Sequence, residues 1–418
     1  MVNARQKQVL RLAIRAGEIM MQSGAEIYRV EDTITRICTA CHIPNVEVFA
    51  TPTGIFVSLD PGEDDSDVFT YVSRLHYSNT NLRKISEINS FSREFTTTDL
   101  SRQEGLARLE EISREKRHPV WLNLIAACVV SMSFCLLMAG TPRDAICSGV
   151  IGTCSYLLSL FLYKYAINYF IRGLCCCAMA TAMALLSVSL SLGQSSGAMV
   201  IGSLMLFVPG AAITNSIRDF LSGDMLAGIA RFTEALVVAI SLAAGAGIML
   251  KIWSISGMTI QSMTTSEDLL IPILLGFAST FGFCILLNVP YRDILPATCI
   301  GGCGWLACEL AAACGFGDIA STFLGACTVG LFSDILSRAL HQASTVYTIP
   351  SIMILVPGAR IYYTMVELIG GKLANAAILG AQTLFAAGAI AIGLLVVGAV
   401  ISIILSINRH LVRAIKYK

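Results

Sequence analysis

The sequence predicts a polytopic α-helical membrane protein, with about ten transmembrane helices in two inverted five-helix repeats behind a small cytoplasmic α/β domain. Three observations support this fold class. Of 418 residues, 55% are hydrophobic and 14% are charged, whereas ordinary soluble proteins carry roughly 25% charge. Residues 1–119 hold 15 of the 29 lysines and arginines, and the long apolar runs begin only at Val120. The tripeptide Val-Pro-Gly interrupts two of those runs, at Val208 and at Val356.

Residues 1–119 are expected to form the cytoplasmic α/β domain. Helices are predicted where apolar residues recur at three- and four-residue spacing, and strands where short segments are rich in β-branched and aromatic residues. The helices are expected at 5–22, 26–40, 82–95 and 100–116, and the strands at 46–50, 54–59 and 68–75. The first thirty residues contain no apolar core of a signal peptide, so the amino terminus is expected to stay in the cytoplasm.

From Val120 onwards the chain offers ten apolar segments of roughly the 17 to 25 residues that cross a bilayer. The first five fill a repeat over 120–253, and the second five fill a repeat over 266–408. The spans are placed at 120–139, 144–163, 170–192, 197–217, 225–250, 268–287, 293–314, 317–337, 348–368 and 376–406.

The distribution of basic residues predicts the orientation of these spans. Cytoplasmic loops of membrane proteins are enriched in lysine and arginine. With the amino terminus inside, one side receives ten of these residues and the other side receives three. We therefore expect a multi-pass protein of the plasma membrane, a bacterial inner membrane, with both termini in the cytoplasm.

The two halves share sequence features at a nearly constant offset. Residues 208–210 match 356–358 at an offset of 148, while Arg143-Asp144 matches Arg292-Asp293 and Gly152 matches Gly301 at 149. Because each half holds five spans, the second copy must enter the membrane from the opposite face. Many secondary transporters use inverted repeats of this kind for alternating access.

Pro209 and Pro357 are expected to break a helix inside the hydrocarbon region, because proline lacks the amide hydrogen and clashes with the preceding turn. Each unpaired backbone group there costs several kcal/mol unless protein or a water-filled cavity satisfies it. The fourth and ninth spans run in opposite directions, so the breaks are expected to face one another across a cavity near the midplane. The half-helix after each break would point its positive amino end at that cavity, which favours a carboxylate.

Arg360 is the leading candidate for substrate binding, since an arginine near the centre of a span costs about 3 kcal/mol or more and points to function. We expect Arg360 to bind a substrate carboxylate. The alternative is a structural ion pair with Glu367 or Asp334. The other candidate binding residues flank the two breaks: Pro209, Gly210, Thr214, Asn215, Pro357, Gly358 and Tyr362.

A second set of charged residues is assigned to coupling or gating: Arg218, Asp219, Glu234, Glu309 and Asp334. Glu234 and Glu309 are candidates for proton coupling, because a carboxylate in an apolar site can exchange its proton near physiological pH. Arg231 stands one turn before Glu234 and would neutralise it. Asp334 lies four residues before Arg338, which favours a mutual ion pair.

Composition and motifs exclude several functions. The net charge is +1 and the basic residues do not gather in one tract, so nucleic acid is not an expected partner. The five histidines give no zinc spacing and no phosphate-binding loop is present, so no metal, cofactor or ATP hydrolysis is expected. Cys38 to His42 fits the haem-attachment pattern, but in a domain assigned to the cytoplasm it is interpreted as two helical cysteines facing the core.

Several motifs together resemble the threonine/serine exporter family: Ser23–Asp32, Thr51–Gly54, both Val-Pro-Gly segments, Arg218-Asp219 and Ser222–Asp224. The similarity covers essentially the whole chain. It implies the fused form of the family, which exports threonine and serine across the plasma membrane with the proton-motive force. Split members are associated with succinate, so a dicarboxylate exporter stays open, with Arg218 as the second cation.

The role of the amino-terminal domain also stays open. One interpretation of Glu26, Arg29, Glu31 and Asp32 is a regulatory or gating surface. The other, a solvated or structural helix face, is favoured. A membrane receptor or scaffold is the alternative from another class, but an anchor gains nothing from two broken helices. An intramembrane enzyme would need a nucleophile paired with a base, and no span offers that pair. The expected partners are a small molecule, protons and lipid, and a homo-oligomer is compatible with the sequence.

Overall fold

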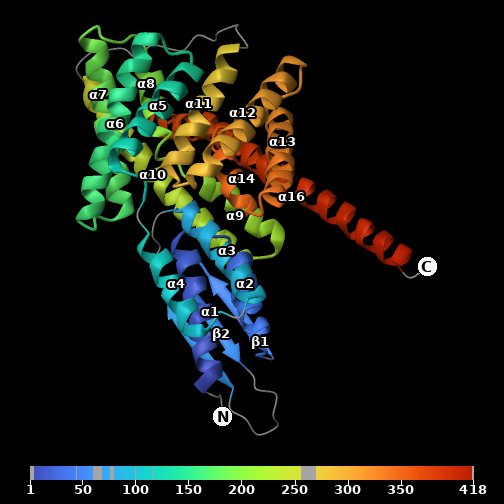
Figure 1. Cartoon of the computed structure of the whole chain (residues 1–418). Helices are drawn as coiled ribbons and strands as arrows, with labels where there is room; N and C mark the ends of the chain where they lie inside the picture. Colours follow the sequence, from blue (N-terminus) through green and yellow to red (C-terminus); the bar gives the residue numbers. More distant parts are fainter. Residues whose placement is uncertain are drawn as a thin grey trace.

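The computed structural model describes residues 4–43, 45–59, 68–75, 80–98, 100–115, 117–255 and 270–416. An amino-terminal unit of helices and a small sheet stands at one end of a larger helical bundle (Figure 1). Its elements are α1 (Ala4–Gln22), α2 (Ile27–Ala40), β1 (Val46–Thr51), β2 (Gly54–Leu59), β3 (Phe69–Arg74), α3 (Leu82–Thr97) and α4 (Arg102–Arg114).

The sheet of the amino-terminal unit is a meander in the order β1-β2-β3, and both strand pairs are antiparallel. The helices and strands lie within a few residues of the predicted segments. The expected α/β type is corrected to an α+β arrangement, because both strand pairs are antiparallel, whereas helical crossovers join parallel strands.

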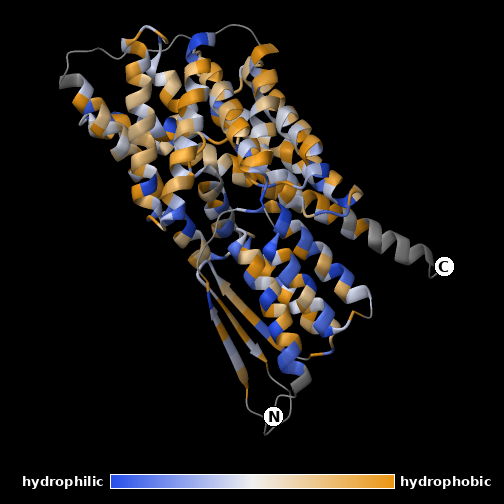
Figure 2. Ribbon diagram, turned by 60° about the vertical axis from the view of Figure 1, so that its left-hand side comes forward, coloured by the Kyte–Doolittle hydropathy of each residue, from blue (hydrophilic) through white to orange (hydrophobic). Residues whose placement is uncertain are grey.

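One face of the sheet carries the core of this unit. Ile55, Val57 and Leu59 alternate along β2 and are buried, because successive side chains of a strand point to opposite faces. They belong to the same apolar cluster as Ile34 of α2. Phe56 points the other way and is exposed, and Figure 2 shows the helices along one face of the sheet.

The bundle begins at Val120, directly after the amino-terminal unit. Its helices are α5 (Val120–Leu137), α6 (Pro142–Lys164), α7 (Tyr169–Ser189), α8 (Ser196–Leu204), α9 (Gly210–Ser222), α10 (Met225–Ile255), α11 (Leu270–Leu286), α12 (Tyr291–Ala313), α13 (Asp318–Ala339), α14 (Ser344–Ile352), α15 (Gly358–Ile369) and α16 (Leu373–Lys416).

Seven helices in the described part of the chain are long and apolar enough to cross a membrane: α5, α6, α7, α10, α12, α13 and α16. Helix α11 is apolar but has 17 residues. The four remaining helices form two interrupted pairs, α8 with α9 and α14 with α15. Hydrophobic residues dominate the bundle, whereas hydrophilic and hydrophobic residues are mixed along the amino-terminal helices (Figure 2). The chain is therefore a multi-pass helical membrane protein.

Helices before and after the 256–269 segment pack in matching patterns. Helix α5 packs on α6 as α11 packs on α12, and α7 packs on α10 as α13 packs on α16. Helix α9 contacts both α10 and α16, and α15 likewise contacts both α16 and α10. The turns correspond as well, since Ala139 and Asn288 end α5 and α11 with φ of 56° and 58°.

The amino-terminal unit is anchored to the turn between α11 and α12. The backbone N–H groups of Leu82 and Arg83 donate to the carbonyls of Leu287 and Asn288 at 3.1 and 2.9 Å. The N–H of His118 donates to the side-chain oxygen of Asn288 at 2.7 Å. We call this end of the bundle the domain side, and the opposite end, where α5 ends and α13 begins, the far side.

Candidate functional site

The two interruptions have the same local conformation. Pro209 has φ −79° and ψ 43°, and Pro357 has φ −76° and ψ 54°. The N–H of Gly210 donates to the carbonyl of Val208 at 2.9 Å, and that of Gly358 donates to Val356 at 2.8 Å. Each proline thus sits in a tight three-residue turn, because it has no N–H with which to continue the preceding helix.

The two breaks lie directly against each other, and not across a cavity as expected from the opposed spans. A Cβ atom on Gly210 would overlap the side chain of Val356, and one on Gly358 would press on Met205 and Val208. Glycine allows this close approach at both positions, most strictly at Gly210, because the side chain of Val356 is less flexible than that of Met205.

A cavity of about 540 Å³ opens beside the second break. Its walls include Pro357, Gly358, Arg360 and Glu309, all predicted site residues. Met205, from the segment just before the first break, forms part of the opposite wall. The cavity extends to Met138 at the end of α5 and to Asp318 at the start of α13, so it lies towards the far side.

Arg360 forms an ion pair with Asp318 across this cavity, with 2.6 Å between Nη2 and Oδ2. The side chain of Arg360 is 27% exposed and that of Asp318 is 77% exposed. The structural partners considered for Arg360 were therefore wrong. Glu367 instead lies 3.6 Å from the ammonium of Lys372, and Asp334 pairs with Arg338 at 2.6 Å as its spacing predicted.

The cavity brings opposite charges together within a largely apolar wall. Arg360 offers a planar fork of donors that fits a carboxylate. Asp318 and Glu309 supply acceptors, and the indole N–H of Trp305 has no hydrogen-bond partner within the described residues. Leu355, Val356 and Phe134 are among the apolar residues that line the cavity. The arrangement can hold a small molecule with a carboxylate and an ammonium group.

The predicted residues that follow the first break do not line this cavity. Thr214 is buried in α9, and its hydroxyl has no partner among the described residues. Asn215 is half-buried on the same helix. Tyr362 follows the second break but does not line the cavity either. It packs edge-on against Tyr363, with 5.6 Å between ring centroids. The open space is thus asymmetric and belongs to the second break.

The candidates for coupling are also separated. Asp219 is buried, and its carboxylate lies 3.4 Å from the guanidinium of Arg231. Arg231 therefore does not neutralise Glu234 alone. Glu234 and Asp334 do not line the cavity, whereas Glu309 does. Arg218 belongs to α9, but its side chain lies outside the described residues.

Sequence reasoning missed Asp318 and Trp305. Asp318 is the first residue of α13, where an acidic residue is usually explained by the helix dipole. Trp305 lies in α12 among apolar residues that suggest packing. A search for charges at the far ends of the spans would have found Asp318, but only the fold brings it to Arg360.

The four residues assigned weakly to regulation divide into two kinds. Asp32 pairs with Arg36 on the surface of α2, which fits the solvated interpretation. Glu26 is buried, and Arg29 pairs with it and reaches α14. Glu31 accepts a hydrogen bond from the N–H of Ala50 at 2.8 Å. Burial raises the pKa of Glu31, that hydrogen bond lowers it, and nearby Asp224 raises it further.

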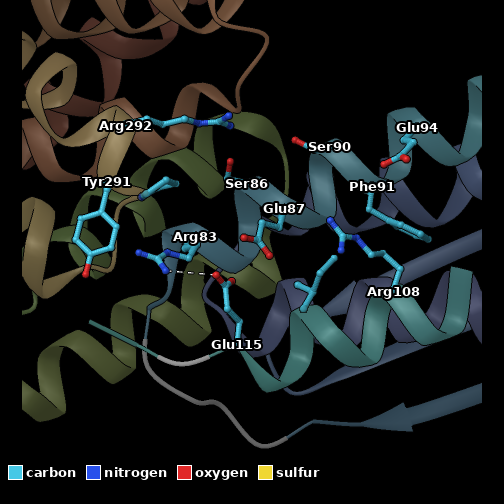
Figure 3. A pocket seen from close by; sticks show the side chains of 12 residues that line it. Arg83, Ser86, Glu87, Ser90, Phe91, Glu94, Arg108, Glu115, Tyr291 and Arg292 are labelled. Atoms are coloured by element: carbon cyan, nitrogen blue, oxygen red, sulfur yellow. Dashed lines mark hydrogen bonds and ion pairs between the residues drawn. The ribbon is translucent and has the colours of Figure 1, made fainter. Parts of the chain in front are cut away.

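A second cavity, of about 460 Å³, lies between the amino-terminal unit and the start of α12. Figure 3 shows Arg83 and Glu115 joined across it, with Glu87 beside them and Tyr291 and Arg292 on the opposite side. The Arg83 Nη1 and Glu115 Oε1 atoms are 3.3 Å apart. This cavity sits at the junction of the two parts and away from both breaks.

Comparison with known proteins identifies the family to which the chain is similar. A family model described as a threonine/serine exporter matches residues 11–253, and a second, described as threonine/serine exporter ThrE, matches residues 272–400. No solved structure matches the chain.

Curated relatives agree with these models. A protein of Mycobacterium tuberculosis named "Probable threonine/serine exporter" is 23% identical over 367 residues, covering 85% of this chain and 69% of that protein. A "Threonine/serine exporter" of Corynebacterium glutamicum is 21% identical over 374 residues, covering 85% and 75%. The "Probable succinate transporter subunit YjjP" of Escherichia coli is 23% identical over 261 residues, covering 62% and 99%. Because the first family model alone spans more than half of the sequence, the chain belongs to the threonine/serine exporter family.

Proposed function

We propose that this chain is a secondary transporter that exports threonine and serine across the plasma membrane in exchange for protons. The observation that carries the proposal is the Arg360–Asp318 ion pair inside the cavity at the second helix break. Family membership supports a transporter of small molecules. The chemistry of the cavity supports an amino acid as the substrate.

In this proposal the substrate competes with the ion pair. Its carboxylate takes the guanidinium of Arg360, and its ammonium group takes the carboxylate of Asp318 or Glu309. Helix α15 begins at Gly358, so the positive end of its dipole adds to the attraction for the carboxylate. The breaks thus provide both the space and part of the binding energy.

We further propose ten spans in two inverted repeats, counting α8–α9 and α14–α15 as one interrupted span each. Matching hydrogen bonds support the repeat. The hydroxyl of Ser203 donates to the carbonyl of Ser148 at 3.3 Å, and that of Ser351 donates to Ala297 at 3.0 Å. Gly152 lies against Ser131 as Gly301 lies against Thr280. The sequence offsets in these pairs are all 148 or 149 residues.

Alternating access follows from this arrangement if the paired half-helices exchange contacts on the two sides of the breaks. We assign proton coupling to Glu309, because it is the predicted coupling carboxylate that lines the cavity. A cytoplasmic location of the amino-terminal unit and of both termini fits the ten-to-three excess of basic residues on that side.

A dicarboxylate is the second candidate substrate, favoured by the similarity to the protein named as a succinate transporter subunit. Two carboxylates would be served best by two cations. Among the described residues that line the cavity, Arg360 is the one cation. The geometry therefore favours a substrate with one carboxylate and one ammonium group.

The test is flux into proteoliposomes that contain the purified chain. Labelled threonine or serine should enter, an imposed pH gradient should accelerate entry, and excess unlabelled serine should compete more strongly than succinate. Stronger competition by succinate would replace the amino-acid proposal with the dicarboxylate one. Absence of flux for both classes would remove the transporter proposal for this chain.

A further inference from the structure

The segment formed by the end of the α1–α2 connection and the first turn of α2 reaches the half-helix that precedes the second break. Arg29 donates from Nη2 to the hydroxyl of Ser344 at 3.1 Å and from Nη1 to that of Thr345 at 3.4 Å. These two residues begin α14. The Nε of Arg29 lies 3.1 Å from the carboxylate of Glu26, and only 4% of the Glu26 side chain is exposed. The guanidinium is therefore held in place from both sides.

The same segment also reaches the half-helix that follows the first break. The carbonyl of Ala25 accepts a hydrogen bond of 3.0 Å from Nη2 of Arg231. Nη1 of Arg231 lies 3.4 Å from the carboxylate of Asp219. Asp219 belongs to α9, whereas Arg231 belongs to α10. The side chains of Arg231 and Asp219 are 13% and 8% exposed, so this bridge is largely shielded from solvent.

We propose that residues 23–29 form a clasp that closes the domain side of the transport pathway by holding α9 and α14 in place together. This inference rests on the proposed transport function. The cavity beside the second break extends towards the far side, where Met138 and Asp318 line it. The structure thus combines an approach from the far side with a fastened domain side.

Each break divides its span into two half-helices, and the clasp holds the two half-helices that lie on the domain side. Helix α9 carries the chain from the first break to the domain side, and α14 carries it from the domain side to the second break. Loading from the domain side would require these half-helices to separate, which would strain or break contacts at Arg29 or at Arg231. Hydrogen bonds to charged groups are stronger than neutral ones, so the clasp favours the fastened state. Arg29 and Arg231 are positioning residues in this scheme.

Hydrogen–deuterium exchange on the full chain in lipid nanodiscs tests the clasp without a transport assay. We expect R29A to accelerate amide exchange in α9 and α14 by about tenfold, while α5 and α12 keep their wild-type rates. The matched control is R36A, which removes another arginine of α2, one that pairs with exposed Asp32. Equal exchange in α9 and α14 for R29A and R36A would overturn the proposal, and so would equal acceleration throughout the bundle.

Variants of the hydrogen-bond acceptors in α14 test the same contact if R29A fails to fold. Replacing the acceptors, in the double variant S344A/T345A, should reproduce the acceleration in α14, and R29K should give an intermediate effect because it keeps the charge but loses the fork. Normal exchange in S344A/T345A would contradict the clasp.

A transport readout then connects the clasp to the cycle. With threonine supplied on the domain side, R29A should lower the half-saturating concentration about threefold, because a larger fraction of molecules is open to that side. R36A should leave it unchanged. If the wild type moves neither threonine nor serine, the proposed function fails, whereas the exchange experiment still decides whether the clasp exists.

Discussion

The hydroxyl of Tyr347 donates a hydrogen bond of 2.7 Å to the carboxylate of Asp293, and both side chains are buried. Asp293 lies near the start of α12 and Tyr347 lies in α14, so the hydrogen bond ties α14, the first half of the second interrupted pair, to α12. Asp144 at the start of α6 makes the corresponding contact before the first interrupted pair. Its carboxylate accepts hydrogen bonds from the N–H groups of Gln194 and Ser195, which directly precede α8. Two different sets of donors thus satisfy equivalent aspartates.

The first prediction concerns this bond. Y347F should destabilise the protein by about 1–3 kcal/mol, because it leaves a buried carboxylate with one donor fewer. Thermal unfolding in detergent would measure the loss, with Y169F on an exposed tyrosine as the control. Equal melting temperatures for Y347F and the wild type would show that Asp293 finds another donor.

The second prediction concerns the contact between the two breaks. G210A and G358A should each weaken folding or transport, because the added methyl group overlaps Val356 in one case and Met205 in the other. Overpacking of this kind typically costs about 1–3 kcal/mol. G388A is the matched control, since its Cβ would meet no atom within 4 Å in the described structure. Wild-type flux and melting temperature in both break variants would contradict the close approach.

The third prediction concerns the cavity. R360K should reduce threonine flux by at least about tenfold with normal membrane insertion, because lysine keeps the charge but cannot bind a carboxylate with a planar fork. R338K, at the ion pair on α13, is the control and should transport normally. Size-exclusion profiles would establish that both variants fold. Unchanged flux in R360K would remove Arg360 from the binding site.

The fourth prediction uses Glu87, which lies outside the bundle. Its pKa is raised to about 7, chiefly by burial and also by the hydrogen bond and charge of Glu115, while Arg83 and Arg108 oppose the rise. The folded protein therefore binds this proton more tightly than the unfolded chain between pH 4.5, the usual pKa, and about 7. Stability from this group is present at low pH and is lost as the pH rises towards 7.

E87Q tests that prediction, because the neutral amide removes the titration. Amide exchange in α3 of the full chain should accelerate between pH 5 and pH 8 in the wild type, after correction for the intrinsic pH dependence of exchange, and should change less in E87Q. The exposed residue Glu111 offers the control variant E111Q. A pH response in E87Q equal to that in the wild type would assign the titration to another group.

Much of the architecture follows from the sequence. Local patterns located the helices and strands of residues 1–119 within a few positions, because apolar periodicity and turn residues act over short distances. Length and hydropathy located the seven long apolar helices of the described bundle. Proline predicted the two interruptions, because its missing N–H acts wherever it stands. The constant offset also showed that Pro209 and Pro357 occupy corresponding places.

The contacts that make the site were decided by tertiary structure. Arg360 was recognisable as unusual, but its pairing with Asp318, 42 positions away, depends on how α13 and α15 meet. The sequence could not show that Arg29 contacts the bundle and is not solvated, because its partner Ser344 lies 315 positions away in the chain. Periodicity and propensity describe the chain near each residue, whereas ion pairs and cavities depend on which distant segments pack together. The sequence by itself determined where the helices break, and only the packed bundle decided which charges the breaks bring together.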